Sequence, residues 1–193
     1  MRAAPQAAAT AAMTALLALA WIPAALAAPP VPAAAATASA DAPDLCSPAR
    51  YATLAPAAQA VCDHGRVWIE RFKAGDIDGL MALYDEHAQV ALHDQRKLVG
   101  KAQIRDFFAP SLAARPEVSF ELHVEDIQVY AETAVLVSRY WYTSTARRGE
   151  RYQDAGRSLL VYKRVPGATG TDQWKILVDI DNNTPDVGFP KPR

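Results

Sequence analysis

The stretch that decides the fold runs from position 68 to position 84 and reads WIERFKAGDIDGLMALY. Its first residues complete a helix-forming segment, residues 57–73, which contains no proline and one glycine. The apolar residues that return to one face of this segment at helical spacing are Val61, Trp68, Ile69 and Phe72. Gly75 suits the end of that helix, and Asp76 suits the cap of a second one. The second helix would bury Ile77, Leu80, Met81 and Tyr84, which follow the spacing i, i+3, i+4 and i+7.

The chain then changes from helical to strand-like patterns. Residues 89–93 and 97–99 predict a short strand pair around a turn at Asp94, and residues 101–108 predict a third helix. Segments rich in β-branched and aromatic residues follow at 118–129, 133–144, 157–164 and 174–182. Helices grouped first and antiparallel strands grouped last indicate an α+β fold.

The first long strand predicts how that sheet is shaped. Its apolar residues alternate up to Val124 and then continue out of phase from Ile127. A slip of one residue is typical of a β-bulge, which bends a strand. We therefore expect three N-terminal helices packed on a curved antiparallel sheet, with a cone-shaped cavity between them.

The N-terminus has the layout of a secretory signal. Arg2 precedes an uncharged apolar run at 11–26, and small residues follow at Ala25-Leu26-Ala27. The run contains Pro23 and is short for a membrane span, although an uncleaved anchor is the alternative. We expect residues 1–27 to be a signal peptide and residues 28–50, rich in Ala and Pro, to be a flexible spacer. The mature protein would then be periplasmic or secreted, without stable membrane association.

Charge and cysteine content narrow the function further. The chain carries 20 Lys and Arg against 21 Asp and Glu, and it has no basic stripe, which argues against a nucleic-acid partner. Arg147, Arg148 and Arg151 cluster beside Glu150 and are expected at a solvated hairpin tip. The two cysteines, Cys46 and Cys62, are either a disulfide, as an oxidising compartment favours, or two reduced thiols.

Three motifs carry a resemblance to a known family. They are the stretch at 68–84, the glycine-led GKAQIRDFF at 100–108, and WKI at 174–176 followed by DIDN at 179–182. In this order they resemble nuclear-transport-factor-2-like (NTF2-like) domains, and more narrowly the SnoaL-like and DUF4440 group. The resemblance implies a cone-shaped domain over residues 51–185 with a tail at 186–193. It also implies a homodimer formed through the outer sheet face, where Trp141 and Val135 would meet the partner subunit.

The ketosteroid isomerases of this superfamily offer a residue-by-residue comparison. Their helix-one tyrosine corresponds to Trp68, and their first-strand aspartate, the proton-shuttling base, corresponds to Leu92. Their third catalytic residue, a protonated aspartate, would lie at 157–163, which contains no carboxylate. Leucine cannot accept a proton, so the chain is not expected to be a typical ketosteroid isomerase.

Candidate site residues come from the polar and aromatic positions of the predicted cone. His93, His123 and Asp181 are candidate acid–base groups, although all three could be ordinary polar-face residues. The residues expected to contact a ligand are Trp68, Tyr84, Leu92, Tyr140, Asp179, Asp181 and Asn182. Trp174, Ile176, Val178 and Ile180 are expected on one face of the last strand, with Asp179 and Asp181 on the other. Alternation alone does not say which of these faces lines the cavity.

Two functions follow from these residues, and a purely structural dimer module is a third alternative. The first is an exported module that binds a small, mostly apolar molecule in its cone. The second is a cofactor-independent cyclase, isomerase or dehydratase that uses acid–base residues in the same cavity. No metal site is expected, because the histidines and cysteines lack ligand spacing.

Overall fold

A long amphipathic helix, α2 (Pro56–Ala74), is the element against which the sheet packs. It begins with Pro56 in its first turn and ends at Gly75, whose φ of 70° is the left-handed conformation that glycine adopts without a steric penalty. This confirms the helix expected at 57–73. The computed structural model describes residues 43–114, 117–145, 149–167 and 172–189. The expected signal peptide, most of the spacer, Arg147 and Arg148 lie outside these residues.

The second helix is much shorter than the sequence pattern predicts. α3 (Ile77–Met81) is capped by Asp76, whose carboxylate accepts a hydrogen bond from the Gly79 backbone N–H at 2.9 Å. Tyr84 does not extend this helix, as expected from its spacing, but opens strand β1 (Tyr84–Ala91). The physical reason is sheet pairing, because the Leu83 carbonyl accepts the Ile176 N–H at 2.9 Å and draws this segment onto the last strand.

The elements around the short strands also depart from expectation. Strand β2 (Leu98–Val99) pairs with β1, and α4 (Lys101–Ala114) continues past the expected end at residue 108 to bury Leu112. Pro110 lies inside α4 and does not end it. The structure adds a short helix, α1 (Pro48–Tyr51), that the sequence did not predict. No helix among the described residues is long and apolar enough to cross a membrane.

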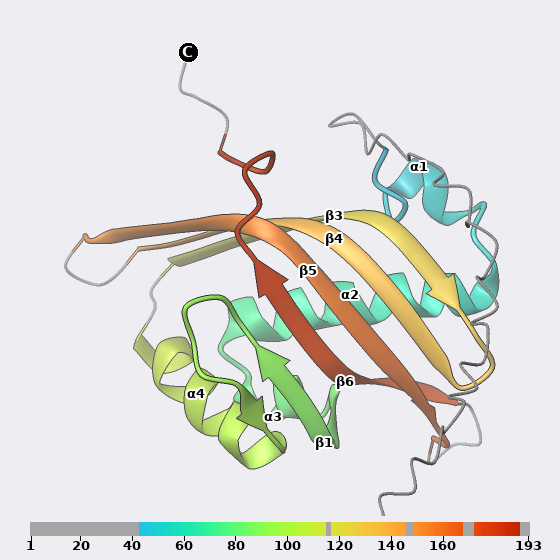
Figure 1. Ribbon diagram of the computed structural model, residues 1–193, viewed down its shortest axis with the longest axis horizontal. Helices are drawn as coiled ribbons and strands as arrows, with labels where there is room; N and C mark the ends of the chain where they lie inside the picture. Colours follow the sequence, from blue (N-terminus) through green and yellow to red (C-terminus); the bar gives the residue numbers. More distant parts are fainter. Residues whose placement is uncertain (1–42, 115–116, 146–148, 168–171, 190–193) are drawn as a thin grey trace, which may run out of the picture. The chain divides into compact units, whose positions relative to one another are not determined.

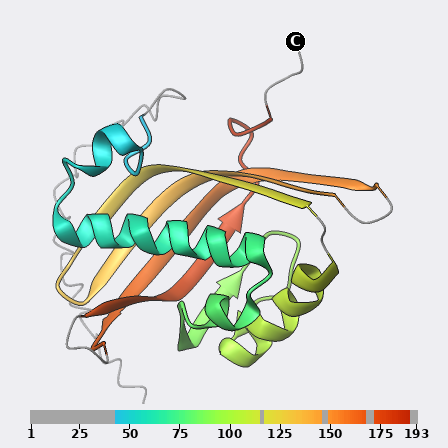
Figure 2. The same cartoon turned by 180° about the vertical axis from the view of Figure 1, so that it is seen from behind.

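Four long strands complete a six-stranded sheet. They are β3 (Glu117–Val129), β4 (Thr133–Thr145), β5 (Arg151–Val165) and β6 (Gln173–Asn182). The order is β2-β1-β6-β5-β4-β3, and all neighbours are antiparallel except β1 and β6, which are parallel. The sheet is therefore mixed and not wholly antiparallel. It curves around α2, with α3 and α4 beside β1 on the same side (Figures 1 and 2).

Two bulges set which side chains face the helices. The register of β3 against β4 shifts between Val124 and Asp126, which confirms the slip predicted from the sequence. A second shift lies between β5 and β6, where Val161 pairs with Val178 and Tyr162 with Ile176, leaving Leu177 as the extra residue. The face predicted for β6 is therefore wrong, because a bulge at this residue reverses the alternation. Ile176 and Asp179 both point inward as a result.

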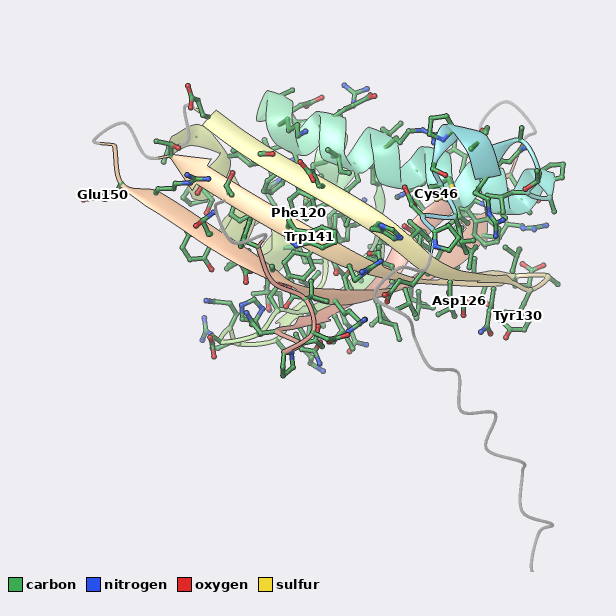
Figure 3. All side chains as sticks on the ribbon, turned by 90° about the horizontal axis from the view of Figure 1, so that it is seen from above. Cys46, Phe120, Asp126, Tyr130, Trp141 and Glu150 are labelled. Atoms are coloured by element: carbon green, nitrogen blue, oxygen red, sulfur yellow. A yellow bond between two sulfur atoms is a disulfide. The ribbon has the colours of Figure 1, made fainter. Side chains whose placement is uncertain are left out.

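The inner face of the sheet and the helices share one apolar core. Its fully buried members come from every layer, and the largest are Val61, Leu80, Tyr84, Val90, Ile104, Leu136, Tyr162 and Ile176. Figure 3 shows the long strands beneath α2, with Glu150 and Tyr130 at opposite ends. The far ends of these strands extend beyond α2, so only their central parts are covered by it (Figure 2).

The segment before α2 is joined to α2 and to the sheet, and the segment after β6 is joined to the sheet. Cys46 and Cys62 form a disulfide with a Cα–Cα distance of 5.6 Å, so the structure favours the bonded alternative. The Asp44 carboxylate accepts hydrogen bonds from the backbone N–H groups of Cys46 and Val124 at 3.0 and 2.9 Å. At the other end, the Trp141 indole donates to the Gly188 carbonyl at 2.9 Å.

Candidate functional site

A cavity of about 540 Å³ lies between α2, α4 and the inner face of the sheet. Its walls come from both helices, from the loop after β1 and from strands β3 to β6. Many of its lining side chains are aromatic, and these rings belong to Trp68, Phe72, Phe107, Phe108, Phe120, Tyr140, Tyr142, Tyr152 and Tyr162. The charged or titratable side chains that line it are those of His93, Glu150, Arg151, Asp154, Asp179 and Asp181.

The aromatic part of the wall is held by ring contacts between α2 and the sheet. Trp68 stacks on Phe72 with ring centroids 4.9 Å apart, and Phe120 of β3 meets Trp68 at 5.4 Å. Phe120 also stacks against Tyr140 of β4 at 6.2 Å. Offset and edge-to-face contacts of this kind are favourable beyond the area they bury. They give the cavity a packed apolar wall with little freedom to collapse.

A hydrogen-bond chain runs from that wall to a buried carboxylate. The Trp68 indole donates to the Tyr84 hydroxyl at 3.0 Å, and this hydroxyl donates to Asp179 at 3.2 Å. Burial, together with the charge of Asp181, raises the pKa of Asp179 to about 7, although the Tyr84 hydrogen bond acts in the opposite direction. Asp179 therefore gains or loses its charge near neutral pH.

A second group of polar side chains surrounds His93, just after β1. The Nδ1 atom of His93 lies 2.8 Å from Asp181, and the same carboxylate oxygen accepts the His93 backbone N–H at 2.7 Å. The Nε2 atom lies 3.4 Å from Asp154. Burial alone would lower the pKa of His93, but the hydrogen bond to Asp181 and the charges of Asp181, Asp154 and Asp94 raise it above its usual value. The imidazole is thus fixed between two carboxylates.

Tyr140 completes this group from β4. Its hydroxyl donates to Asp154 at 3.2 Å and lies 3.5 Å from His93 Nδ1. Burial and the negative charges of Asp181 and Asp154 raise the pKa of Tyr140 far above its ordinary value. The phenol therefore stays protonated and available as a hydrogen-bond donor at the cavity wall.

The comparisons with known proteins place the chain in a family. The family model of the SnoaL-like domain matches residues 66–164, which include the C-terminal half of α2, the helices α3 and α4, and most of the sheet. The chain belongs to the SnoaL-like family. A comparison with curated proteins finds no match.

Solved structures agree with this SnoaL-like assignment at the level of the fold. An NTF2-like superfamily protein from Salmonella enterica is 18% identical, with a TM-score of 0.58, over 70% of this chain and 96% of that one. A candidate scytalone dehydratase from Novosphingobium aromaticivorans is 14% identical, with a TM-score of 0.60, over 71% and 89%. A ketosteroid isomerase-like protein from Erwinia carotovora is 17% identical, with a TM-score of 0.54, over 66% and 96%. The NTF2-like cone expected from the sequence is confirmed.

The SnoaL-like domain brings together most of the site residues that the sequence predicted. Trp68, Leu92, Tyr140, Asp179 and Asp181 all line the cavity, as does His93. Tyr84 reaches it only through its hydrogen bond to Asp179, and it does so from β1 and not from a helix. Asp85, Glu86 and His87 also belong to this strand.

Two predicted residues lie elsewhere. His123 pairs in register with Arg139, whose neighbours Ser138 and Tyr140 face inward, so His123 lies on the outer face and not in the cavity. Asn182 ends β6 opposite Arg157 and is exposed. The reason is strand alternation, which places successive side chains on opposite faces.

Sequence reasoning missed Asp154 and Tyr162. Asp154 lies in the first part of β5, which was expected to begin only at residue 157. The alternation of Tyr152 and Asp154 continues the strand pattern toward the hairpin and is the signal that could have found it. Among the described residues, no group of three His, Cys, Asp or Glu side chains is arranged to hold a metal ion.

Proposed function

We propose that this SnoaL-like domain binds a small, largely apolar molecule in its cavity. The observation that carries the proposal is a volume of about 540 Å³ surrounded by aromatic rings, with a few polar groups on one side. Ligand sites in proteins typically measure about 300–1,000 Å³ and combine mostly apolar walls with a small number of convergent polar groups. The ring contacts of Trp68 and Phe120 keep the cavity from closing in the absence of a ligand.

A pair of matched variants tests this proposal. Leu122 lines the cavity, whereas its neighbour Glu121 is exposed and points away from it. Leu122→Trp should fill part of the cavity and weaken binding of an apolar probe such as 1-naphthalenemethanol, measured by titration calorimetry. Glu121→Trp adds the same side chain to the opposite face and should leave the affinity unchanged. Equal affinities for both variants would show that the probe binds outside the cavity.

Acid–base turnover is the second candidate function, and a specific arrangement favours it. Asp179 has a pKa of about 7, and His93 is held by Asp181 at 2.8 Å in the same cavity. Asp179, and His93, whose pKa is raised above its usual value, could remove a proton from a bound molecule at one position and return it at another. Such chemistry is that of a cofactor-independent isomerase, cyclase or dehydratase.

The two functions predict different behaviour of the same protein. A binding module retains its ligand unchanged, whereas an enzyme converts small carbonyl or hydroxy compounds at a rate that depends on pH. His93→Gln should abolish such a rate while leaving apolar binding intact, because the amide cannot transfer a proton at neutral pH. A conversion that persists in His93→Gln would exclude this residue as the acid–base group.

We also propose that the domain functions outside the cytoplasm. The N-terminal signal layout and the Cys46–Cys62 disulfide support this, because disulfides persist mainly in oxidising compartments. A thiol count on unreduced protein from the extracytoplasmic fraction of its host should find no free thiol. Two free thiols, or an uncleaved chain found only in the cytoplasm, would contradict export.

A further inference from the structure

We propose that the ligand is a small organic cation, with an apolar or aromatic body and one protonated amine bound between Asp179 and Asp181. This inference rests on the proposed binding function and names the chemical class that the cavity selects. The apolar body would contact the aromatic wall built by Trp68, Phe72 and Phe120. The amine would meet the side of the cavity formed by β5 and β6, which we call the acidic wall and define as Asp154, Asp179 and Asp181.

The acidic wall has little positive charge to balance it. Among the described residues, the basic partner recorded for Asp154 and for Asp181 is the same side chain, His93, at 3.4 and 2.8 Å. Asp179 accepts a hydrogen bond from the Tyr84 hydroxyl, which is neutral. One imidazole carries at most one positive charge, so the three carboxylates share no more than that. Glu150 and Arg151 also line the cavity, but both are exposed and their formal charges cancel.

The outer face of the same sheet shows how this fold balances a carboxylate when no ligand is needed. Glu125 lies 3.0 Å from Arg139 and 2.8 Å from Arg157, two permanently charged guanidinium groups. Carboxylates buried without such partners are costly. The contrast indicates that the acidic wall obtains its balancing charge from outside the chain.

The spacing of Asp179 and Asp181 suits a single ammonium group. They are two residues apart on β6, so both side chains project to the same face, about 6–7 Å apart along the strand. The charge of Asp181 already disfavours ionisation of Asp179, which shows that the two carboxylates interact across this gap. A cation placed between them would relieve that repulsion and satisfy both.

An unpaired hydroxyl provides an independent sign that a polar group of the ligand reaches this depth. Tyr162 is fully buried and lines the cavity, and its hydroxyl has no hydrogen-bond partner among the described residues. Buried polar atoms normally have a partner, and this one lies within electrostatic reach of Asp179. Its oxygen can accept one N–H of an ammonium group whose other N–H groups face the two carboxylates.

Aromatic rings beside the acidic wall favour a cation over a neutral amine. The Tyr140 hydroxyl donates to Asp154, and the rings of Tyr142 and Tyr152, with centroids 5.9 Å apart, line the same cavity. Ring faces attract cations electrostatically, and the attraction grows when the site is shielded from water. An anionic ligand would meet both the ring faces and the carboxylates with the wrong sign of charge.

Three probes with the same naphthalene body test the inference at pH 8. They are 1-naphthylmethylamine, which is cationic, 1-naphthalenemethanol, which is neutral, and 1-naphthoate, which is anionic. Hydrogen bonds to charged groups contribute about 1.5–3 kcal/mol, so the amine should bind about ten- to a hundredfold more tightly than the alcohol in titration calorimetry. The naphthoate should bind more weakly than both.

Variants of the acidic wall locate the effect. Asp179→Asn and Asp181→Asn should each reduce the preference for the amine over the alcohol, and the double variant should abolish it, while all keep affinity for the alcohol. Retained alcohol binding shows that the cavity is folded. Asp126→Asn is the matched control, since it removes a carboxylate from an exposed position of β3 and should change nothing.

The outcomes separate this inference from the function on which it rests. Equal affinity for the amine and the alcohol, or tighter binding of the naphthoate, overturns the cation proposal while the cavity remains a binding site. An amine preference that survives the double variant also overturns it, because the charge would then be recognised elsewhere. Failure of all three probes to bind up to millimolar concentration overturns the proposed binding function together with the inference.

Discussion

Replacing Asp179 by asparagine should stabilise the protein at alkaline pH. The Asp179 carboxyl is buried in the cavity wall, where Tyr84 donates its only recorded hydrogen bond among the described residues. Asparagine keeps an oxygen that can accept this bond and removes the charge that burial disfavours. The variant isolates the electrostatic effect, because the side chain keeps its size and its partner.

The magnitude and the sign follow from the pKa. The pKa of Asp179 is raised from its ordinary value of 3.8 to about 7 by burial and by the charge of Asp181. Each pKa unit corresponds to about 1.36 kcal/mol, so ionising Asp179 costs the native state about 4 kcal/mol. Below pH 3.8 the carboxyl is protonated in both states and the native state suffers no such cost. The free energy of unfolding then falls as the pH rises to about 7, and it stays lowered at higher pH.

Urea unfolding of both proteins across pH 4–8 measures the effect. The difference in unfolding free energy between Asp179→Asn and the wild type should be near zero at pH 4. It should grow with pH and level off above pH 7 at about 2–4 kcal/mol in favour of the variant, because relaxation of the native state offsets part of the cost. A difference that is constant across this range would refute the elevated pKa, and a less stable variant at pH 8 would show that the carboxylate is balanced within the protein.

Three further predictions concern other parts of the molecule. Replacing Cys46 and Cys62 by serine should lower the free energy of unfolding by about 3 kcal/mol in urea titrations, because the disulfide closes a loop between residues 16 apart; an unchanged midpoint would contradict this. Asp181→Asn should lower the pKa of His93 measured by NMR, and an unaltered titration would show that the contact does not form in solution. Leu159 is 39% exposed on the outer sheet face, and we propose that this face forms a homodimer. Leu159→Arg should then shift the wild-type dimer to monomer in sedimentation experiments, whereas a monomeric wild type at micromolar concentration counts against the dimer.

The helical half of the fold could be predicted where local chemistry decides it. Gly75 and Asp76 mark the end of α2 and the cap of α3, and both act locally. Tyr84 shows the limit, because its spacing fits a helix while its position in the structure depends on pairing with Ile176, 92 residues later in the chain. No local pattern contains that information.

In the strands, too, some features could be predicted from the local sequence and others could not. The bulge in β3 interrupts the alternation of apolar residues between Val124 and Ile127, so the sequence reveals it. The extra residue at Leu177 lies in a run where apolar residues occupy both faces, so no change in the alternation marks it. The candidate site therefore needed the structure to reveal that Asp179 and Ile176 share the inner face. Asp154 was missed for another reason, since the strand was assumed to begin too late.

The most direct test of the central claim is native mass spectrometry of the wild type and Leu122→Trp, each purified without denaturation from the extracytoplasmic fraction of the host. Leu122 lines the cavity, so the variant serves as the cavity-filled control. We predict that the wild type carries a small bound molecule that is absent or depleted in the variant. A wild type that is empty in this preparation, and that takes up no naphthalene probe when one is added, would contradict the claim that the cavity is a binding site.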